Sequence, residues 1–208
     1  MSSALIADDH PVVRAAVKIL LKQEGFNQIV EVAAGNEVLP AIREHNPDLM
    51  ILDLGMPKLD GLDVLARIQS SDLRCRVVVF TGQEADYYQE RCMRAGAVAY
   101  VSKTNDLQHL HKAVHAVRAG YSYFIQLRSS SVSMTALQRS EKEMIDRLSD
   151  RELTIFQHLA RGRGNKEIAE IMNLSHKTVS TYKTRLVEKL NVDSKVHLRD
   201  FAKRNHLI

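Results

Sequence analysis

The chain has 208 residues, of which 45% are hydrophobic, and it carries a formal net charge of +4, which suits two ordinary domains with cores of their own. Only Cys75 and Cys92 are present, without C-x-x-C spacing, so neither a disulfide framework nor a zinc ribbon is indicated. No apolar run approaches the ~18 residues of a membrane span, and Asp8 and Asp9 interrupt any signal-peptide core. We therefore expect a soluble, cytoplasmic protein with no membrane partner.

The first half alternates short apolar runs with longer amphipathic segments. The apolar runs predict strands at residues 4–8, 28–33, 48–54, 76–81 and 97–103. The amphipathic segments predict helices at residues 11–25, 36–45, 61–71, 84–96 and 106–120. A repeated βα unit with right-handed crossovers predicts an α/β fold, a doubly wound, five-stranded parallel sheet of the flavodoxin-like kind.

Polar residues fall at the carboxyl ends of four of these strands. Asp8 and Asp9 close the first strand, Asp53 the third, Thr81 the fourth and Lys103 the fifth. Because the carboxyl ends of parallel strands line one crevice, we expect these side chains to meet there. Three crowded carboxylates require a cation, and oxygen ligands without His or Cys suit Mg²⁺. The set predicts phosphoryl transfer, with Asp53 as nucleophile and with Lys103 and Thr81 binding the phosphoryl oxygens.

The charge balance reverses in the second half of the chain. Residues 1–120 hold 13 Lys and Arg against 15 Asp and Glu, whereas residues 149–208 hold 12 against 7. A basic second half suggests a polyanionic partner. Between them, residues 121–148 begin with a serine-rich stretch, which includes Ser129 and Ser133, and continue into a polar amphipathic segment that could form a short helix. We interpret residues 121–148 as a linker.

Three helices are predicted after the linker. A capping box of Ser149 and Glu152 opens the first, Asn165 is expected to cap the second, and Ser175 the third. The third helix, residues 176–190, separates an apolar face from a small polar face, as does a helix that enters a DNA major groove. The residues expected to contact DNA bases or phosphates are Lys177, Thr178, Ser180, Thr181, Lys183, Thr184, Arg185 and Lys189.

The stretches IADDHPVVR, LMILDLGMPKLDG, VVVFTGQ and AYVSK resemble the receiver domain of two-component response regulators over residues 1–120. The resemblance implies that a sensor histidine kinase phosphorylates Asp53. It also implies a Mg²⁺ ion held directly by Asp9, Asp53 and the Gly55 backbone carbonyl, with Asp8 as an outer-sphere ligand.

The second half, residues 149–208, resembles the LuxR-type helix-turn-helix domain. The whole chain thus resembles the NarL/FixJ family, and HKTVSTYKTRLVEKL and DFAKRN are similar to its BvgA/EvgA subfamily. The resemblance implies a transcription factor rather than an enzyme, in which the Thr81 hydroxyl moves toward the new phosphate while the Tyr100 ring turns inward. Phosphorylation is expected to promote homodimerisation, with Lys195 to Arg204 as a dimer helix, and binding to promoter DNA.

Other interpretations stay open from sequence alone. A regulator whose receiver no longer switches would keep the same DNA-binding half. A phosphatase of the haloacid dehalogenase kind also uses a strand-end Asp with Mg²⁺, but it needs a second Asp where this chain has Gly55. His10 is expected to orient its loop. We expect His111 and His115, four residues apart, to lie on a solvated or dimer-facing helix, because no Glu or Cys completes a metal set there.

Overall fold

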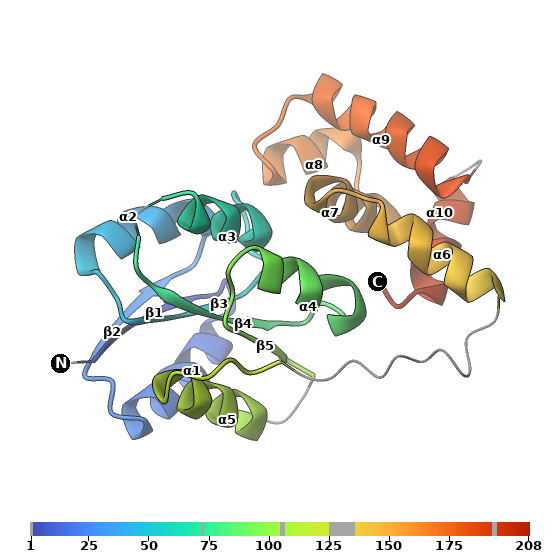
Figure 1. Ribbon diagram of the computed structural model, residues 1–208. Coiled ribbons are helices and arrows are strands. Elements are labelled where there is room, and N and C mark those ends of the chain that lie inside the picture. The colour runs from blue at the N-terminus through green and yellow to red at the C-terminus, as the bar shows by residue number, and fades with distance from the viewer. Residues whose placement is uncertain (1, 72, 105–106, 125–135, 193–194) are drawn as a thin grey trace. The chain divides into compact units, whose positions relative to one another are not determined.

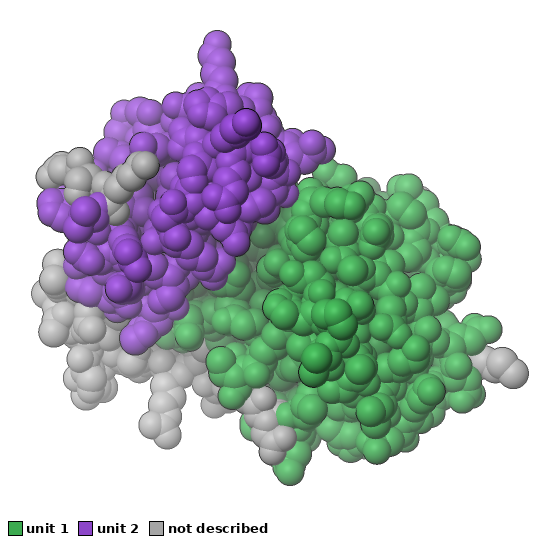
Figure 2. Space-filling model, turned by 180° about the vertical axis from the view of Figure 1, so that it is seen from behind, with its two compact units in different colours: residues 1–126 green, residues 127–208 purple. Residues whose placement is uncertain are grey.

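The computed structural model describes residues 2–71, 73–104, 107–124, 136–192 and 195–208. The chain forms two compact units, residues 1–126 and residues 127–208, which Figure 2 colours separately. The first unit is an α/β sheet structure and the second is helical, so the predicted fold class is confirmed. No helix within the described ranges is long and apolar enough to cross a membrane.

The first unit contains all five predicted strands and helices. The strands are β1 (Ser3–Ala7), β2 (Gln28–Val32), β3 (Leu49–Leu52), β4 (Arg76–Thr81) and β5 (Ala99–Ser102). The helices are α1 (Pro11–Gln23), α2 (Gly35–His45), α3 (Gly61–Gln69), α4 (Ala85–Arg94) and α5 (Leu107–Arg118). The strands pair in parallel in the order β2-β1-β3-β4-β5. Helices α1 and α5 cover one face, and α2, α3 and α4 cover the other (Figure 1).

The sheet is apolar on both faces because helices cover both. Ile6, Ile51 and Val78 belong to the core shared with α1 and α5, and each is at most 2% exposed. The residues that alternate with them, such as Leu5 and Met50, are also buried at 1% or less. All four residues of β3 are buried, as the apolar run before Asp53 predicts.

Strand register brings the functional residues to one edge of the sheet. Ala7 of β1 pairs with Leu52 of β3, so the residues that follow these strands are neighbours. The Asp53 N–H donates to the Ala7 carbonyl at 2.8 Å, and the Lys103 N–H donates to the Thr81 carbonyl at 2.7 Å. These backbone bonds extend the strand pairing by one residue beyond each strand and hold the site residues in place.

The second unit comprises α6 (Ala136–Asp146), α7 (Asp150–Ala160), α8 (Asn165–Ile171), α9 (His176–Leu190) and α10 (Lys195–Arg204). Its core includes Leu153, Val179 and Leu186, and the rings of Phe156 and Phe201 meet edge to face at 6.0 Å. These side chains come from α7, α9 and α10, so the core joins three helices that the sequence separates.

Two of the three predicted helix caps are confirmed. Ser149 and Glu152 form the capping box of α7, and the Ser175 side chain accepts from the Thr178 N–H at 3.0 Å at the start of α9. The predicted Asn165 cap is wrong by one residue. Gly164 has the extended backbone of an N-cap and leaves the helix without a side-chain cap.

The predicted linker, residues 121–148, is shorter at both ends in the structure. The Tyr123 N–H donates to the Val98 carbonyl at 3.0 Å, and the Tyr123 carbonyl accepts from the Tyr100 N–H at 3.0 Å, so this segment continues the first unit. Helix α6 belongs to the second unit, where Ile145 is fully buried. The serine-rich residues 129–133 lie outside the described residues.

Candidate functional site

An acidic cluster lies at the carboxyl edge of β1 and β3. Asp8, Asp9, His10 and Asp53 each offer one donor atom within 4.8 Å of the others, and no other such group of metal-binding side chains occurs among the described residues. Asp8 and Asp53 are only 3% and 5% exposed. Buried carboxylates so close together repel one another strongly, so the site requires positive charge.

Lys103 supplies one positive charge to this cluster. Its Nζ lies 2.8 Å from Asp8 Oδ2 and 2.7 Å from Asp53 Oδ2. Burial alone would lower the pKa of Lys103, but the charges and hydrogen bonds of Asp53 and Asp8 outweigh it and raise the pKa. The lysine is therefore protonated at neutral pH and bridges the ends of β1 and β3.

Backbone and side-chain donors fix the two buried carboxylates. The His10 N–H donates to Asp8 Oδ1 at 2.9 Å, and the Gly55 N–H donates to Asp53 Oδ1 at 3.2 Å. Arg14 Nη1 donates to the Asp8 carbonyl at 2.8 Å. The two backbone N–H groups hold each carboxylate at a defined orientation, and Arg14 holds the Asp8 backbone. His10 Nδ1, 3.3 Å from Asp8 Oδ1, supports the loop-orienting interpretation of His10.

Asp9 differs from its two acidic neighbours. Its Oδ1 is buried and makes no hydrogen bond, although it lies 2.7 Å from His10 Nδ1 in poor hydrogen-bonding geometry. Although the Asp9 side chain is about one-third exposed, this one oxygen is shielded from solvent, and a shielded carboxylate oxygen without a hydrogen bond is costly. A divalent cation with oxygen preference would satisfy it.

Thr81 and Tyr100 lie beside the cluster, joined through Gln83. Thr81 is 1% exposed, and its Oγ1 accepts from the Gln83 N–H at 3.4 Å. Tyr100 is fully buried, and its hydroxyl donates to the Gln83 carbonyl at 2.8 Å. Burial raises the pKa of Tyr100 well above its usual range, so the phenol is neutral. The ring is turned inward in this structure.

Sequence reasoning missed one ionic cluster in the first unit. Glu24, which follows α1, is 9% exposed, and its Oε1 lies 2.8 Å from His111 Nε2 on α5. His115 Nδ1 lies 3.8 Å from Glu24 Oε2, and Arg118 Nη1 lies 3.3 Å from the same oxygen. The packing of α1 on α5 therefore brings an acidic residue to both histidines, which the sequence did not reveal. Glu24, His111 and His115 do not form a common metal-binding group.

Helix α9 presents a polar face to solvent, as the sequence predicts. The exposed residues of this helix among those expected at DNA are Lys177, Ser180, Thr181, Thr184, Arg185 and Lys189, and the half-buried ones are Thr178 and Lys183. The opposite face holds Val179, Leu186 and Leu190, which are at most 2% exposed. The two faces are thus separated as a groove-binding helix requires.

Three hydroxyl groups on α9 are already engaged within the helix. Thr181 Oγ1 donates to the Lys177 carbonyl at 3.1 Å, and Thr184 Oγ1 donates to the Ser180 carbonyl at 3.3 Å. Thr178 Oγ1 lies 2.7 Å from the Ser175 hydroxyl at the helix cap. The hydroxyls of Thr181 and Thr184 use their protons for the backbone and present their lone pairs outward as acceptors.

Lys189 has a partner that the sequence did not reveal. Its Nζ lies 2.7 Å from Oε2 of Glu152, the buried acid of the α7 capping box. Burial alone would raise the pKa of Glu152, but the hydrogen bonds from Lys189 and Ser149 outweigh it and lower the pKa. The ion pair ties the end of α9 to the start of α7, so less of the Lys189 charge remains for a phosphate than at Lys183 or Arg185.

Both halves of the chain match known families. Residues 4–115 match the response regulator receiver domain, and residues 146–202 match the luxR family of bacterial regulatory proteins. The chain belongs to the response regulators that join a receiver to a LuxR-type DNA-binding domain, and it is a transcription regulator of that family.

Its relatives match over nearly their whole length. The virulence-factor transcription regulator BvgA of Bordetella pertussis (strain Tohama I) is 49% identical over 99% of both chains. The DNA-binding transcriptional activator EvgA of Escherichia coli (strain K12) is 32% identical over 99% of both. The structure of Salmonella typhimurium RcsB is similar with a TM-score of 0.75, 25% identity and 98% coverage of both chains. A structure of an RcsB–DNA complex matches with a TM-score of 0.56, 25% identity and coverage of 97% and 98%.

Proposed function

We propose that this regulator is switched by phosphorylation of Asp53, donated by a sensor histidine kinase. The observation that carries the proposal is the pairing of Lys103 with both Asp8 and Asp53 at the edge of the sheet. A lysine that already contacts a buried nucleophilic carboxylate can follow the negative charge when that carboxylate gains a phosphoryl group. A helix-capping aspartate would need no such partner.

In the proposed reaction, an Asp53 carboxylate oxygen attacks the phosphorus of a phosphohistidine. A new O–P bond forms, the N–P bond breaks, and the histidine nitrogen leaves with its electron pair. The Gly55 N–H, 3.2 Å from Asp53 Oδ1, orients the attacking carboxylate. Lys103 and the Thr81 hydroxyl then bind phosphoryl oxygens, and Tyr100 stays in its inward position behind Thr81.

The residues present fit Mg²⁺. Apart from the His10 ring nitrogen, the donors are oxygens, the three carboxylates outnumber the single lysine charge, and one buried oxygen of Asp9 makes no hydrogen bond. Asp9, Asp53 and the Gly55 carbonyl would hold the ion directly, with Asp8 in its outer sphere. When bound, Mg²⁺ would neutralise negative charge that gathers during transfer.

On the DNA side, we infer that α9 reads promoter DNA in a major groove. The outward lone pairs of Thr181 and Thr184 suit acceptance from the amino group of adenine or cytosine, and Lys177 and Ser180 flank them. Lys183 and Arg185 are assigned to phosphates, with smaller roles for Thr178 and Lys189 because of their internal contacts. The RcsB–DNA structure offers a precedent for this fold on DNA.

Phosphorylation is proposed to promote a homodimer through the receiver and through α10, so that two helices α9 reach two half-sites. The receiver is proposed to act as the first unit, residues 1–126, and the DNA-binding part as the second, in which α6 precedes the helices from residue 149 onward. A kinase partner and a DNA partner together favour a cytoplasmic location. Because the relatives are transcription regulators, the phosphatase alternative is set aside.

The test compares DNA binding before and after phosphorylation. Wild type, Asp53→Asn and Asp86→Asn, which changes an exposed acid on α4, are treated with acetyl phosphate and Mg²⁺ and titrated onto a duplex selected by the wild type. Treatment should tighten binding by wild type and by Asp86→Asn but leave Asp53→Asn unchanged. A wild type that binds equally with and without the donor would support the non-switching alternative and contradict the proposal.

A further inference from the structure

Helix α6 carries an acidic residue on the face that it buries. Ile145 of α6 and Leu148, just beyond the helix, are at most 2% exposed, and Glu141, one turn before Ile145, is 5% exposed. Burying a carboxylate here costs the free energy of removing its charge from water, a cost that an apolar side chain would avoid. A buried carboxylate therefore needs hydrogen-bonding or charged partners, and those partners indicate its role.

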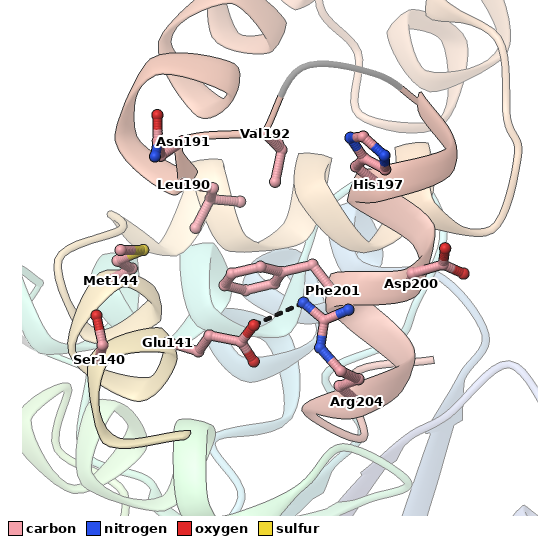
Figure 3. A pocket seen from close by; sticks show the side chains of 10 residues that line it. All are labelled: Ser140, Glu141, Met144, Leu190, Asn191, Val192, His197, Asp200, Phe201 and Arg204. Atoms are coloured by element: carbon pink, nitrogen blue, oxygen red, sulfur yellow. Dashed lines mark hydrogen bonds and ion pairs between the residues drawn. The ribbon is translucent and has the colours of Figure 1, made fainter. Parts of the chain in front are cut away.

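Both oxygens of Glu141 are paired with the carboxyl end of α10. Arg204 Nη2 donates to Glu141 Oε1 at 2.6 Å (Figure 3), and Asn205 Nδ2 donates to Oε2 at 2.8 Å. Asn205 also donates to the Phe201 carbonyl at 2.9 Å, and the Arg204 guanidinium lies 5.9 Å from the Phe201 ring. We call Glu141, Arg204 and Asn205 the α6–α10 clasp.

Apolar packing around the clasp is incomplete. A hollow of about 320 Å³ lies between α6, the end of α9 and α10, bordered by Met144, Leu190, Val192 and Phe201 (Figure 3). Helices with a gap between them can slide or rotate, because nonpolar contacts have no preferred direction. Charge-assisted hydrogen bonds are directional, so the clasp adds a defined register of α6 on α10 to the packing of Ile145 and Phe201.

The clasp lies beyond the segment that the luxR family shares. The family match covers residues 146–202, whereas Glu141 precedes it and Arg204 and Asn205 follow it. The clasp therefore joins the segments that flank the shared domain on either side. One of the two helices that it joins is α10, which is proposed to pair two copies of the chain. The angle of α10 on its own domain decides where the second copy's α9 falls along the DNA.

We propose that Glu141 is a positioning residue for DNA binding by the paired protein. It acts through Arg204 and Asn205, which set α10 in the orientation needed for two copies to occupy two half-sites. The inference rests on the proposed function, since it requires paired binding. The inference predicts no change in the contacts that a single α9 makes with its own half-site.

The test uses the full-length chain treated with acetyl phosphate, and two duplexes. One duplex, selected by wild type from random sequence, holds two half-sites, and the other holds one. Glu141→Ala should bind the two-site duplex about tenfold more weakly and the single-site duplex within about twofold of wild type. Glu143→Ala, an exposed acid on α6, is the matched control and should match wild type on both.

A charge exchange separates positioning from mere folding. Glu141→Arg combined with Arg204→Glu should recover most of the two-site affinity that either single change loses. Equal loss on both duplexes, unchanged two-site binding by Glu141→Ala, or no recovery in the exchange would each overturn the positioning role. A wild type that gains nothing from the second half-site would instead refute paired binding itself, and the role of Glu141 would fall with it.

Discussion

Replacing Lys103 by methionine removes the positive charge between two buried carboxylates while keeping the volume of the side chain. Asp8 and Asp53, both within 2.8 Å of the lysine, would then face each other without the lysine charge between them. Breaking a buried ion pair from one side costs about 3–5 kcal/mol, and the backbone hydrogen bonds that both carboxylates keep favour the lower end, about 3 kcal/mol. For a unit of 126 residues this corresponds to a fall in Tm of about 12 °C.

The assay is thermal unfolding of wild type and Lys103→Met at neutral pH, without and with Mg²⁺. Because the pKa of Lys103 is raised, the stability from its pairing is fully present below pH ~10 and is lost only as the pH rises through the folded-state pKa. Mg²⁺ at 100 times its Kd adds about 2.7 kcal/mol, and it should stabilise the variant more than wild type because no lysine competes with it. Lys22→Met, an exposed lysine on α1, serves as control.

The reasoning would be refuted if Lys103→Met and wild type had the same Tm in the absence of Mg²⁺. It would also be refuted if Mg²⁺ stabilised wild type and the variant equally, because the lysine would then not stand in for the metal charge.

Three further predictions concern signal lifetime, base reading and pH. A Cβ at residue 55 would lie 3.7 Å from Asp53 Oδ2, so Gly55→Asn can place an amide beside the phosphoryl group and should speed its hydrolysis. The decay of the phosphorylated protein after donor removal measures this rate, and a slower decay in the variant counts against the prediction. Thr181→Ala should cost about 1–3 kcal/mol at particular base pairs, whereas Lys183→Ala should weaken all sequences and flatten the salt dependence, as titrations on selected and scrambled duplexes would reveal. Burial, with nearby arginines, lowers the pKa of His158 to about 4, so the free energy of unfolding of the second unit should fall by up to about 3 kcal/mol as pH falls from about 6.5 through 4. Unfolding measurements on His158→Gln should show a flatter dependence on pH.

Much of the site follows from the order of residues along the chain. Apolar runs that end on Asp8, Asp53, Thr81 and Lys103 predict buried parallel strands, and a parallel sheet brings their carboxyl ends together whatever the loops do. The periodicity of residues 176–190 likewise predicts which face of α9 is exposed. These features depend on local pattern and a general rule of sheet geometry.

The ionic contacts that sequence did not reveal depend on one side chain reaching another helix. Glu24 meets His111 only because α1 packs beside α5. Glu141 lies in a polar segment that suggests a solvated linker, and only the packing of α6 against α10 shows that it is buried beside Arg204. The inward ring of Tyr100 is a choice between rotamers, which residue type alone does not determine.

Phosphoryl uptake by Asp53 is the most direct test of the proposed switch. Wild type and Asp53→Asn are incubated with acetyl phosphate, with Mg²⁺ or with a chelator, and their intact masses are recorded. We expect wild type to gain the mass of one phosphoryl group only when Mg²⁺ is present, and Asp53→Asn to gain none. Equal labelling of the Asn variant, or labelling of wild type that persists with the chelator, would contradict the assignment of Asp53 and its metal.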